Sequence, residues 1–237
     1  MPEARIYIPP QELNEIIEIR ENRAIHKIKN VLRLKRDNTI AVFDGKGKEY
    51  LYNLIEIKRN LISLKKNKLC REQECPKKRI TLGFPLTKEE KVDFILQKAT
   101  ELGIFTFLPF VSDRSISAQP SPSKVERWKK IIIEASRQCE RLWLPTLSAV
   151  SSFSELCKTT FSFKFAASIR GEKLEDFINP NISEALIAIG PEGDFSPEEY
   201  ESLIKNNFRL VRICDNILRV ETAAIFAAGL LGYYLNK

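Results

Sequence analysis

Residues 185–200 of the chain read ALIAIGPEGDFSPEEY. A run of small and branched apolar residues, typical of a buried strand, ends at Gly190. Ser196 is predicted to cap a helix that has Pro197 at its first position and Glu199 as the second member of a capping box. The stretch therefore predicts a strand, a glycine loop and a helix, the unit from which α/β domains with parallel sheets are built.

The loop Gly190–Gly193 contains no lysine or arginine. Loops between a strand and a helix often bind phosphate, because helix N-termini attract anions. Here Glu192 and Asp194 disfavour a phosphate, and neither a Walker sequence nor a G-x-G-x-x-G fingerprint is present. An acidic loop tolerates a cationic ligand such as a sulfonium. The loop alone does not decide between that ligand and a turn with a structural role.

The same alternation of strands and helices extends from residue 80 to the C-terminus. The expected strands are 80–84, 104–111, 163–168, 185–189 and 210–213, and the expected helices are 88–102, one capped by Ser123 with Glu126, and two more from about Pro197 and Glu221. Ligands of parallel sheets gather beyond the carboxyl ends of the strands. The strand ends at 168–172, 190–194 and 214–219 are therefore expected to form a site.

The first third of the chain has a different pattern, with several short strands around one helix. The expected strands are 4–8, 39–43, 49–57 and 61–64, the helix is 23–33, and the polar stretch 65–78 is the expected linker. Such a module predicts a closed or nearly closed β-barrel.

Most of the chain's net charge of +7 lies in this first third. Residues 1–72 contain 16 Lys and Arg against 10 Asp and Glu, whereas the remainder is nearly balanced. This asymmetry fits a basic module that faces a polyanion, with nucleic acid the first candidate. A basic surface that serves solubility explains the same numbers equally well.

Cysteine and histidine usage excludes several classes of site. The five cysteines lack the paired spacing of a zinc site, and His26 is the only histidine. We therefore expect no metal, and reduced thiols in a cytoplasmic protein. No signal peptide is recognisable, and the apolar stretch 223–235 is too short to span a bilayer.

Arg219 precedes an apolar helix whose start is marked by Glu221 or Thr222. If Arg219 is buried, it needs an acidic partner or a ligand; on a surface loop it needs neither, and the pattern allows both. Gln138 and Arg141 share a helix face, which is also typical of a solvated polar stripe.

Short motifs are spread along nearly the whole chain. They are Arg5-Ile-Tyr, His26 with 31–34 (VLRL), 43–47 (FDGKG), 97–103 (QKATELG), Arg114-Ser115, Gln138 with Arg141, 189–193 (IGPEG) and 217–223 (ILRVETA). Each is weak alone, but their order and spacing are specific. Together they resemble the RsmE family of SPOUT-class methyltransferases, which methylate N3 of a uridine in small-subunit (16S) ribosomal RNA.

The resemblance implies a PUA-like RNA-binding barrel over residues 1–72 and, over residues 73–237, a SPOUT methyltransferase domain with a C-terminal trefoil knot. Knots are nearly absent from proteins, so the periodicity of the sequence could not suggest one. The resemblance also implies S-adenosylmethionine as cofactor, small-subunit ribosomal RNA or the assembled subunit as partner, and a homodimer. A non-catalytic RNA-binding or ribosome-assembly protein on the same fold is the alternative.

Carried over to this chain, the family's cofactor site falls on the three strand ends. The implied cofactor-binding residues are Ser168, Ile189, Gly190, Pro191, Glu192, Gly193, Ile213, Cys214, Ile217, Leu218 and Thr222. The family usually has glycine where Asp194 stands and another glycine near Cys214, so Asp194 and Cys214 are departures.

Transfer to the uracil N3 requires loss of its proton, and therefore a base or a cation that stabilises the uracil anion. Our hypothesis is that Arg141 and Arg219 stabilise this anion and that Gln138 or Glu221 orients the ring. The cations expected to contact RNA phosphates are Arg5, Lys27, Arg33 and Arg36.

Overall fold

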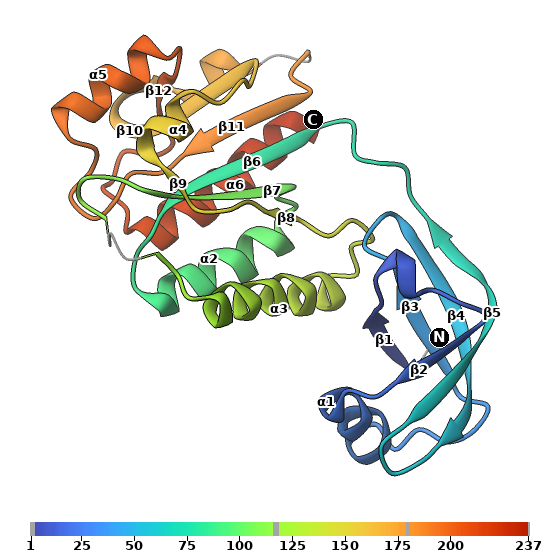
Figure 1. Ribbon diagram of the computed structural model, residues 1–237. Coiled ribbons are helices and arrows are strands. Elements are labelled where there is room, and N and C mark those ends of the chain that lie inside the picture. The colour runs from blue at the N-terminus through green and yellow to red at the C-terminus, as the bar shows by residue number, and fades with distance from the viewer. Residues whose placement is uncertain (1–2, 116–118, 179–180, 237) are drawn as a thin grey trace. The chain divides into compact units, whose positions relative to one another are not determined.

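The computed structural model describes residues 3–115, 119–178 and 181–236. The chain forms two compact units (Figure 1). The N-terminal unit combines Met1–Cys75 with Ser136–Leu144, and the C-terminal unit combines Pro76–Ala135 with Pro145–Lys237. The chain therefore passes from one unit to the other after Cys75, within helix α3, and again after Leu144.

The N-terminal unit is a five-stranded sheet, within the residues that the structure describes, with strand order β1-β3-β4-β5-β2. Its strands are β1 (Ala4–Tyr7), β2 (Ile16–Ile19), β3 (Thr39–Phe43), β4 (Lys48–Ile57) and β5 (Ile62–Glu72). A short 3-10 helix, Pro10–Glu12, follows β1, and α1 (Asn22–His26) continues as a π-helical turn to Val31. One apolar core contains residues of β2, β3, β4, β5 and the helical segment, so the sheet curves around α1.

One sequence-based expectation for this unit is wrong, and one strand is missing from the predicted set. The polar stretch 65–78 is mostly strand, because β5 continues to Glu72 and pairs with β4 as far as Lys48. Strand β2 was not expected. Its alternation of exposed and buried residues covers only Ile16–Ile19, and the stretch is short and flanked by charged residues.

The C-terminal unit contains a seven-stranded sheet in the described part of the chain, with order β12-β10-β11-β6-β7-β8 and β9 beside β7. Its strands are β6 (Arg79–Pro85), β7 (Thr106–Val111), β8 (Thr146–Leu147), β9 (Ser151–Ser152), β10 (Phe163–Lys173), β11 (Glu184–Ala188) and β12 (Arg209–Arg212). The strand pairs of this sheet are parallel, as the sequence predicts. The carboxyl ends of the neighbouring strands β12, β10 and β11 consequently lie at one edge.

Helices follow the strands of this sheet (Figure 1). They are α2 (Glu89–Glu101), α3 (Pro122–Gln138), α4 (Phe153–Cys157), the 3-10 helix Leu174–Phe177, α5 (Pro197–Lys205) and α6 (Val220–Asn236). A core cluster joins α4 and α5 to the sheet, and α6 packs against α2 and β6. The predicted cap of α3 at Ser123 is wrong: the Ser121 hydroxyl accepts the Lys124 N–H, so Ser121 caps the helix, which begins at Pro122.

Strands β10 and β12 have an unusual pairing. Val211 of β12 pairs with Ala167 and also with Glu172, and the register of β10 shifts between those two partners. Gly171 lies in the shifted part. A Cβ atom added to Gly171 would lie 2.5 Å from the backbone nitrogen of Val211, so β12 passes closer than any side chain at residue 171 would allow.

Replacing Gly171 by alanine is therefore expected to lower the free energy of unfolding by about 2–3 kcal/mol, because the methyl group would overlap backbone atoms that cannot rotate away. Urea-induced unfolding of the variant measures the loss. Gly229→Ala is the matched control: its methyl would meet the Leu102 side chain at 3.7 Å, and a glycine in helix α6 gains about 0.5–1 kcal/mol on becoming alanine. Equal stability of the two variants would contradict the inference that β12 passes too close to Gly171 for a side chain.

Candidate active site

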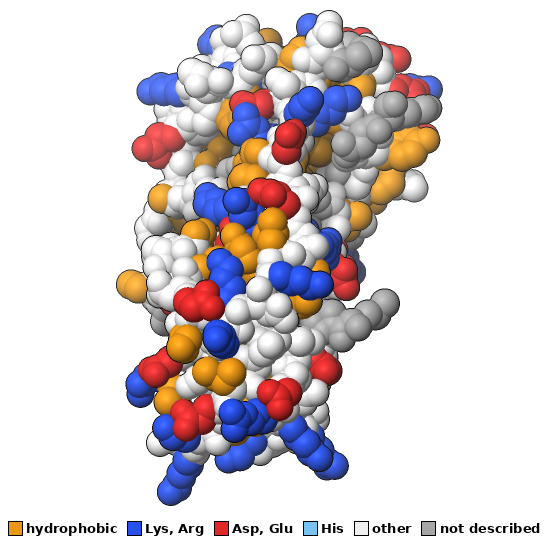
Figure 2. Space-filling view, turned by 90° about the vertical axis from the view of Figure 1, so that its right-hand side faces the viewer, with side chains coloured by type: hydrophobic (Ala, Val, Ile, Leu, Met, Phe, Trp, Pro, Cys, Tyr) orange, Lys and Arg blue, Asp and Glu red, His pale blue; other side chains and the backbone are white. Residues whose placement is uncertain are grey.

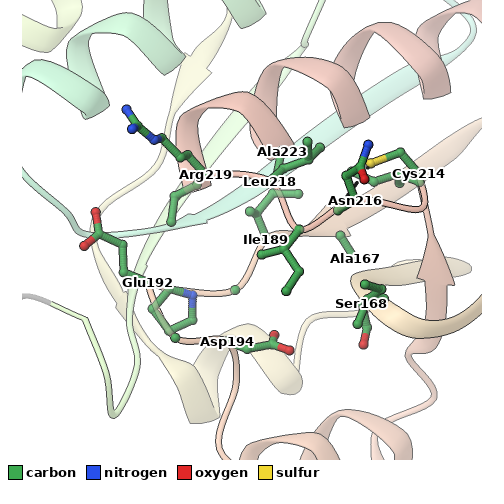
Figure 3. Close-up of a pocket in the computed structure, with 17 residues that line it drawn as sticks. Ala167, Ser168, Ile189, Glu192, Asp194, Cys214, Asn216, Leu218, Arg219 and Ala223 are labelled. Atoms are coloured by element: carbon green, nitrogen blue, oxygen red, sulfur yellow. Dashed lines mark hydrogen bonds between the residues drawn. The ribbon is translucent and has the colours of Figure 1, made fainter.

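A cavity of about 540 Å³ opens at the carboxyl ends of β10, β11 and β12 (Figure 3). The three strand ends that the sequence places together meet around it. The cavity is lined, within the described residues, by 167–169, 189–194, 213–214, 216–220 and Ala223. All of these residues belong to the C-terminal unit.

The glycine loop after β11 is held in a tight turn against the cavity. A Cβ atom on Gly190 would lie 3.0 Å from the Asp194 carboxylate and 3.3 Å from the Phe195 ring, so this position leaves little room for a side chain. Gly193 has φ of +94°, which favours glycine. The Arg114 guanidinium donates to the Gly193 carbonyl, and this bond ties the loop to the segment after β7.

The N-terminus of α5 fixes the other end of this loop. Ser196 and Glu199 form the capping box that the sequence predicts. The Glu199 side chain is buried, and its second carboxylate oxygen accepts the Asp113 N–H at 3.0 Å. The Asp113 carboxylate in turn accepts the Ser196 hydroxyl at 3.1 Å. These reciprocal bonds connect the start of α5 to the segment after β7.

Lys91 of α2 joins two acidic residues near the mouth of the cavity. Its ammonium group pairs with Glu192 of the glycine loop and, at 3.3 Å, with Glu221 in the first turn of α6. The hydrogen bond to Lys91 lowers the pKa of the Glu192 carboxyl. Lys91 therefore balances the charge of Glu192 and connects the glycine loop to α6.

A second set of polar contacts lies on another side of the cavity. The Tyr200 hydroxyl of α5 is 2.7 Å from an Asp194 carboxylate oxygen and 2.9 Å from the Ser168 hydroxyl. Burial, followed by the hydrogen bond and charge of Asp194, raises the pKa of Tyr200 to about 12. Tyr200 is therefore protonated at neutral pH, and it links β10, the glycine loop and α5.

The cavity lining contains every residue predicted to contact the cofactor except Thr222, which is exposed on α6. Cys214, one of the two departures noted in the sequence, lines the cavity and directs its thiol to the Asn216 carbonyl at 3.2 Å. Asp194, the other departure, also lines it. The contacts of these residues with a cofactor stay predictions.

The four predicted catalytic residues are divided between the units. Arg219 lines the cavity and is exposed, on the same side as Glu192 in Figure 3. Glu221 is not part of the lining and faces Lys91. Gln138 and Arg141 belong to the N-terminal unit, where the Arg141 Nε donates to the Trp143 carbonyl at 2.7 Å. Burial lowers the pKa of Arg141 to about 10, so the guanidinium keeps its charge at neutral pH.

Arg5, predicted to contact RNA, has an internal position in the N-terminal unit. Its side chain is only 10% exposed and forms a 2.5 Å ion pair with Glu49. Its terminal nitrogens donate to the carbonyls of Ser136, Arg137 and Arg141. These contacts occupy every nitrogen of the guanidinium, and we therefore assign Arg5 to holding segment 136–144 rather than to phosphate binding.

The other three predicted RNA contacts lie on the helical segment and the turn that follows it. Arg33 and Arg36 are exposed, and Arg33 has a positive φ of 52° in the turn after the π-helical segment. Lys27 is half-buried. Figure 2 shows Lys and Arg side chains gathered over the N-terminal unit at the lower end of the view, with acidic side chains between them.

Two other kinds of feature are absent from the described residues. No group of three or more His, Cys, Asp or Glu side chains among them is arranged to hold a metal ion. None of the helices described is both long and apolar enough to cross a membrane.

Comparison with known proteins decides the family. A model of an RNA methyltransferase domain matches residues 73–232, and a model of an RNA methyltransferase PUA domain matches residues 21–67. The ribosomal RNA small subunit methyltransferase E of Rickettsia conorii is 32% identical over 94% of this chain and 92% of its own length. The chain belongs to the methyltransferase E family. Its relative in Bacillus subtilis is 30% identical over 88% of this chain and 87% of its own length.

Solved structures of similar proteins share the fold. The methyltransferase E of Neisseria gonorrhoeae, solved with S-adenosyl methionine bound, is 29% identical with a TM-score of 0.86, over 98% of this chain and 97% of that one. A predicted RNA methyltransferase from Thermotoga maritima is 27% identical with a TM-score of 0.74, over 97% of both chains. The α/β class, the parallel sheet and the small PUA-like β domain predicted from the sequence are thereby confirmed.

Several residues around the cavity of this methyltransferase E family member were not predicted from the sequence. Lys91, Arg114 and Tyr200 support the glycine loop from three other parts of the chain. Ala167, Val220 and Ala223 complete the lining outside the predicted strand ends. Ala223 falls within the motif that carries the resemblance, and Arg114 within another. Lys91 and Tyr200 lie on helices whose sequence pattern gives no indication of these partners.

Proposed function

We propose that this chain transfers the methyl group of S-adenosylmethionine to N3 of a uridine in small-subunit ribosomal RNA. The observation that carries the proposal is the cavity at the ends of β10, β11 and β12, whose glycine loop provides carboxylates and backbone groups but no lysine. Membership of the methyltransferase E family and the cofactor bound to the Neisseria relative support it.

The residues of the cavity fit this cofactor. Its volume of about 540 Å³ lies in the usual range of roughly 300–1,000 Å³ for small-molecule sites. Apolar side chains such as Ile189 and Leu218 suit an adenine ring, and the glycine loop lets backbone groups approach a ligand closely. When bound, S-adenosylmethionine supplies a methyl group on a positively charged sulfur. The carboxylates of Glu192 and Asp194 favour that charge over a phosphate.

Arg219 is the residue of the cavity best suited to act on the uracil. It is exposed at the cavity and, among the described residues, has no ion pair at hydrogen-bonding distance. A guanidinium in this position would donate to the uracil oxygen on which negative charge develops when the N3 proton leaves. Glu221 is held by Lys91, so we propose that it positions the start of α6 rather than the ring. The roles expected of Gln138 and Arg141 stay predictions.

The N-terminal unit is proposed to position the RNA. Arg33 and Arg36 are exposed and contribute to the excess positive charge of residues 1–72. Phosphate contacts from such side chains fix the register of a nucleic acid without reading its sequence. We propose a cytoplasmic location, because that is where a ribosomal RNA substrate is met.

Two further properties are proposed on the family resemblance. The first is a homodimer that uses α6, on which Phe226 and Tyr233 are 43% and 61% exposed. The second is the trefoil knot. The pairing of Val211 with both Ala167 and Glu172, and the close approach of Gly171 to the β12 backbone, are the observations that support it.

Transfer of labelled methyl groups tests the function. Small ribosomal subunits that lack the modification are incubated with the protein and labelled S-adenosylmethionine, and the labelled base is then mapped. We expect label on N3 of a single uridine. Absence of label together with intact RNA binding and no cofactor binding would overturn the proposal and favour a binding protein on a methyltransferase fold.

A further inference from the structure

Asp194 has a backbone conformation that calls for an explanation. Its φ is +67°, in the left-handed region where glycine is favoured and aspartate is tolerated at some cost. A glycine here would relieve that cost. The side chain lines the cavity, and Figure 3 shows it pointing toward the side on which Ser168 lies. A strained position with a carboxylate at a binding cavity suggests that the carboxylate itself has a use.

For each hydrogen bond around Asp194, the chemistry of the groups decides which one is the donor. An ionised carboxylate accepts hydrogen bonds and cannot donate, so the Tyr200 hydroxyl donates to Asp194. Tyr200 has a single proton, and its contact with Ser168 must therefore run from the Ser168 hydroxyl to the Tyr200 oxygen. The other Asp194 oxygen accepts the Phe195 N–H at 2.9 Å. Each carboxylate oxygen retains a lone pair for a further donor.

These contacts orient the carboxylate, and neither of the two donors carries a charge. The charged residues that line the cavity are Glu192, Asp194 and Arg219. Glu192 is paired with Lys91, whereas the hydrogen-bond partners of Asp194 are a neutral hydroxyl and a backbone N–H. Arg219 lies on the Glu192 side of the cavity in Figure 3. Asp194 therefore supplies negative charge on the opposite side, next to Ser168.

We propose that Asp194, oriented by Tyr200 and Ser168, is a specificity-determining residue that makes this cavity prefer a cationic sulfonium ligand to its neutral thioether product. The inference rests on the proposed function, because it concerns the same cavity and cofactor. S-adenosylmethionine carries one more positive charge than S-adenosylhomocysteine. The two ligands share their other charged groups, so a carboxylate in the cavity distinguishes them by the charge on sulfur and strengthens binding of the substrate relative to binding of the product.

The test compares dissociation constants measured by isothermal titration calorimetry for three ligands. They are S-adenosylmethionine, S-adenosylhomocysteine and sinefungin, in which a cationic amine replaces the sulfonium. In Asp194→Asn, we expect affinity for the two cationic ligands to fall roughly tenfold relative to the thioether. In Tyr200→Phe, we expect a smaller change in the same direction, because the carboxylate is less well oriented. Asp194→Gly suits the positive φ and should reproduce the loss if Asp194→Asn folds poorly.

Glu198→Gln is the matched control. Glu198 is an exposed carboxylate on α5 outside the cavity lining, so the substitution makes the same change in net charge and should leave the ratio of affinities unaltered. Equal weakening of all three ligands in Asp194→Asn and Asp194→Gly would show a structural role and overturn the inference. An unchanged ratio in both would overturn it as well. If the unsubstituted protein binds neither S-adenosylmethionine nor S-adenosylhomocysteine, the proposed function fails, and this inference fails with it.

Discussion

Replacing Arg219 by lysine is expected to slow methyl transfer by roughly 10²- to 10³-fold, the loss seen when one donor to a developing oxyanion is removed. Arg219 is exposed at the cavity, and its planar guanidinium can direct two N–H groups toward a uracil oxygen and a neighbouring acceptor. The ammonium group of lysine is a shorter-reaching point charge without that geometry. We expect the affinity for the cofactor to depend much less on Arg219, because the backbone groups and carboxylates proposed to contact the cofactor belong to other lining residues.

Single-turnover kinetics with saturating S-adenosylmethionine give the rate of transfer, and calorimetry gives the Kd of the cofactor. We expect the rate to fall while the Kd changes by less than about twofold. Arg212→Lys is a suitable control, since Arg212 lies in β12 outside the cavity lining and pairs with Asp215. A parallel loss of rate and cofactor affinity, or an unchanged rate, would remove Arg219 from the chemistry.

Replacing Arg5 by methionine is expected to destabilise the protein by about 3–5 kcal/mol, the usual cost of leaving one member of a buried ion pair without its partner. Glu49 is 4% exposed in its side chain and, among the described residues, would keep only Arg71, at 3.5 Å, as a cationic partner. The carbonyls of Ser136 and Arg141 would also lose their donor, a further penalty for buried polar groups. The effect is on stability, so it should appear without RNA or cofactor.

Urea-induced unfolding monitored by tryptophan fluorescence measures this change. The double variant Arg5→Met with Glu49→Leu serves as a control, because removal of both charges should recover part of the stability lost by Arg5→Met alone. A loss below about 1 kcal/mol for the single variant would indicate that the pair is solvated and that Arg5 is free for another role.

The local features of the C-terminal unit could be predicted because they depend on residues near one another in sequence. The capping box of Ser196 and Glu199, the strand before Gly190 and the three strand ends around the cavity all follow from hydrophobic period and short motifs. The resemblance to a family added the cofactor and the substrate, which no pattern of apolar residues encodes.

Features that depend on distant residues could not be predicted in this way. Tyr200 and Ser168 meet across 32 positions, and Lys91 and Glu192 across 101. Arg5 was expected on the surface because a basic residue in a basic module usually lies there, whereas Glu49 and three carbonyls keep it inside. The part of β5 beyond Leu64 has the sequence pattern of a linker because it is rich in lysine and mostly exposed.

Segment 136–144 has a consequence for how the chain can be divided. Its backbone is hydrogen-bonded to the turn between β3 and β4: the Gly47 N–H donates to the Leu142 carbonyl, and the Leu144 N–H donates to the Gly45 carbonyl. The Trp143 indole N–H donates to the Gln73 carbonyl. A fragment that ends at Cys75 would lack these partners, and a fragment that begins at Pro76 would carry a segment with nothing to pair with. Cleavage of the chain at one position, or a gene fusion that uses only one boundary, therefore cannot separate the two units intact. Recombination that exchanges the RNA-binding part between relatives has to transfer two separate stretches of sequence together.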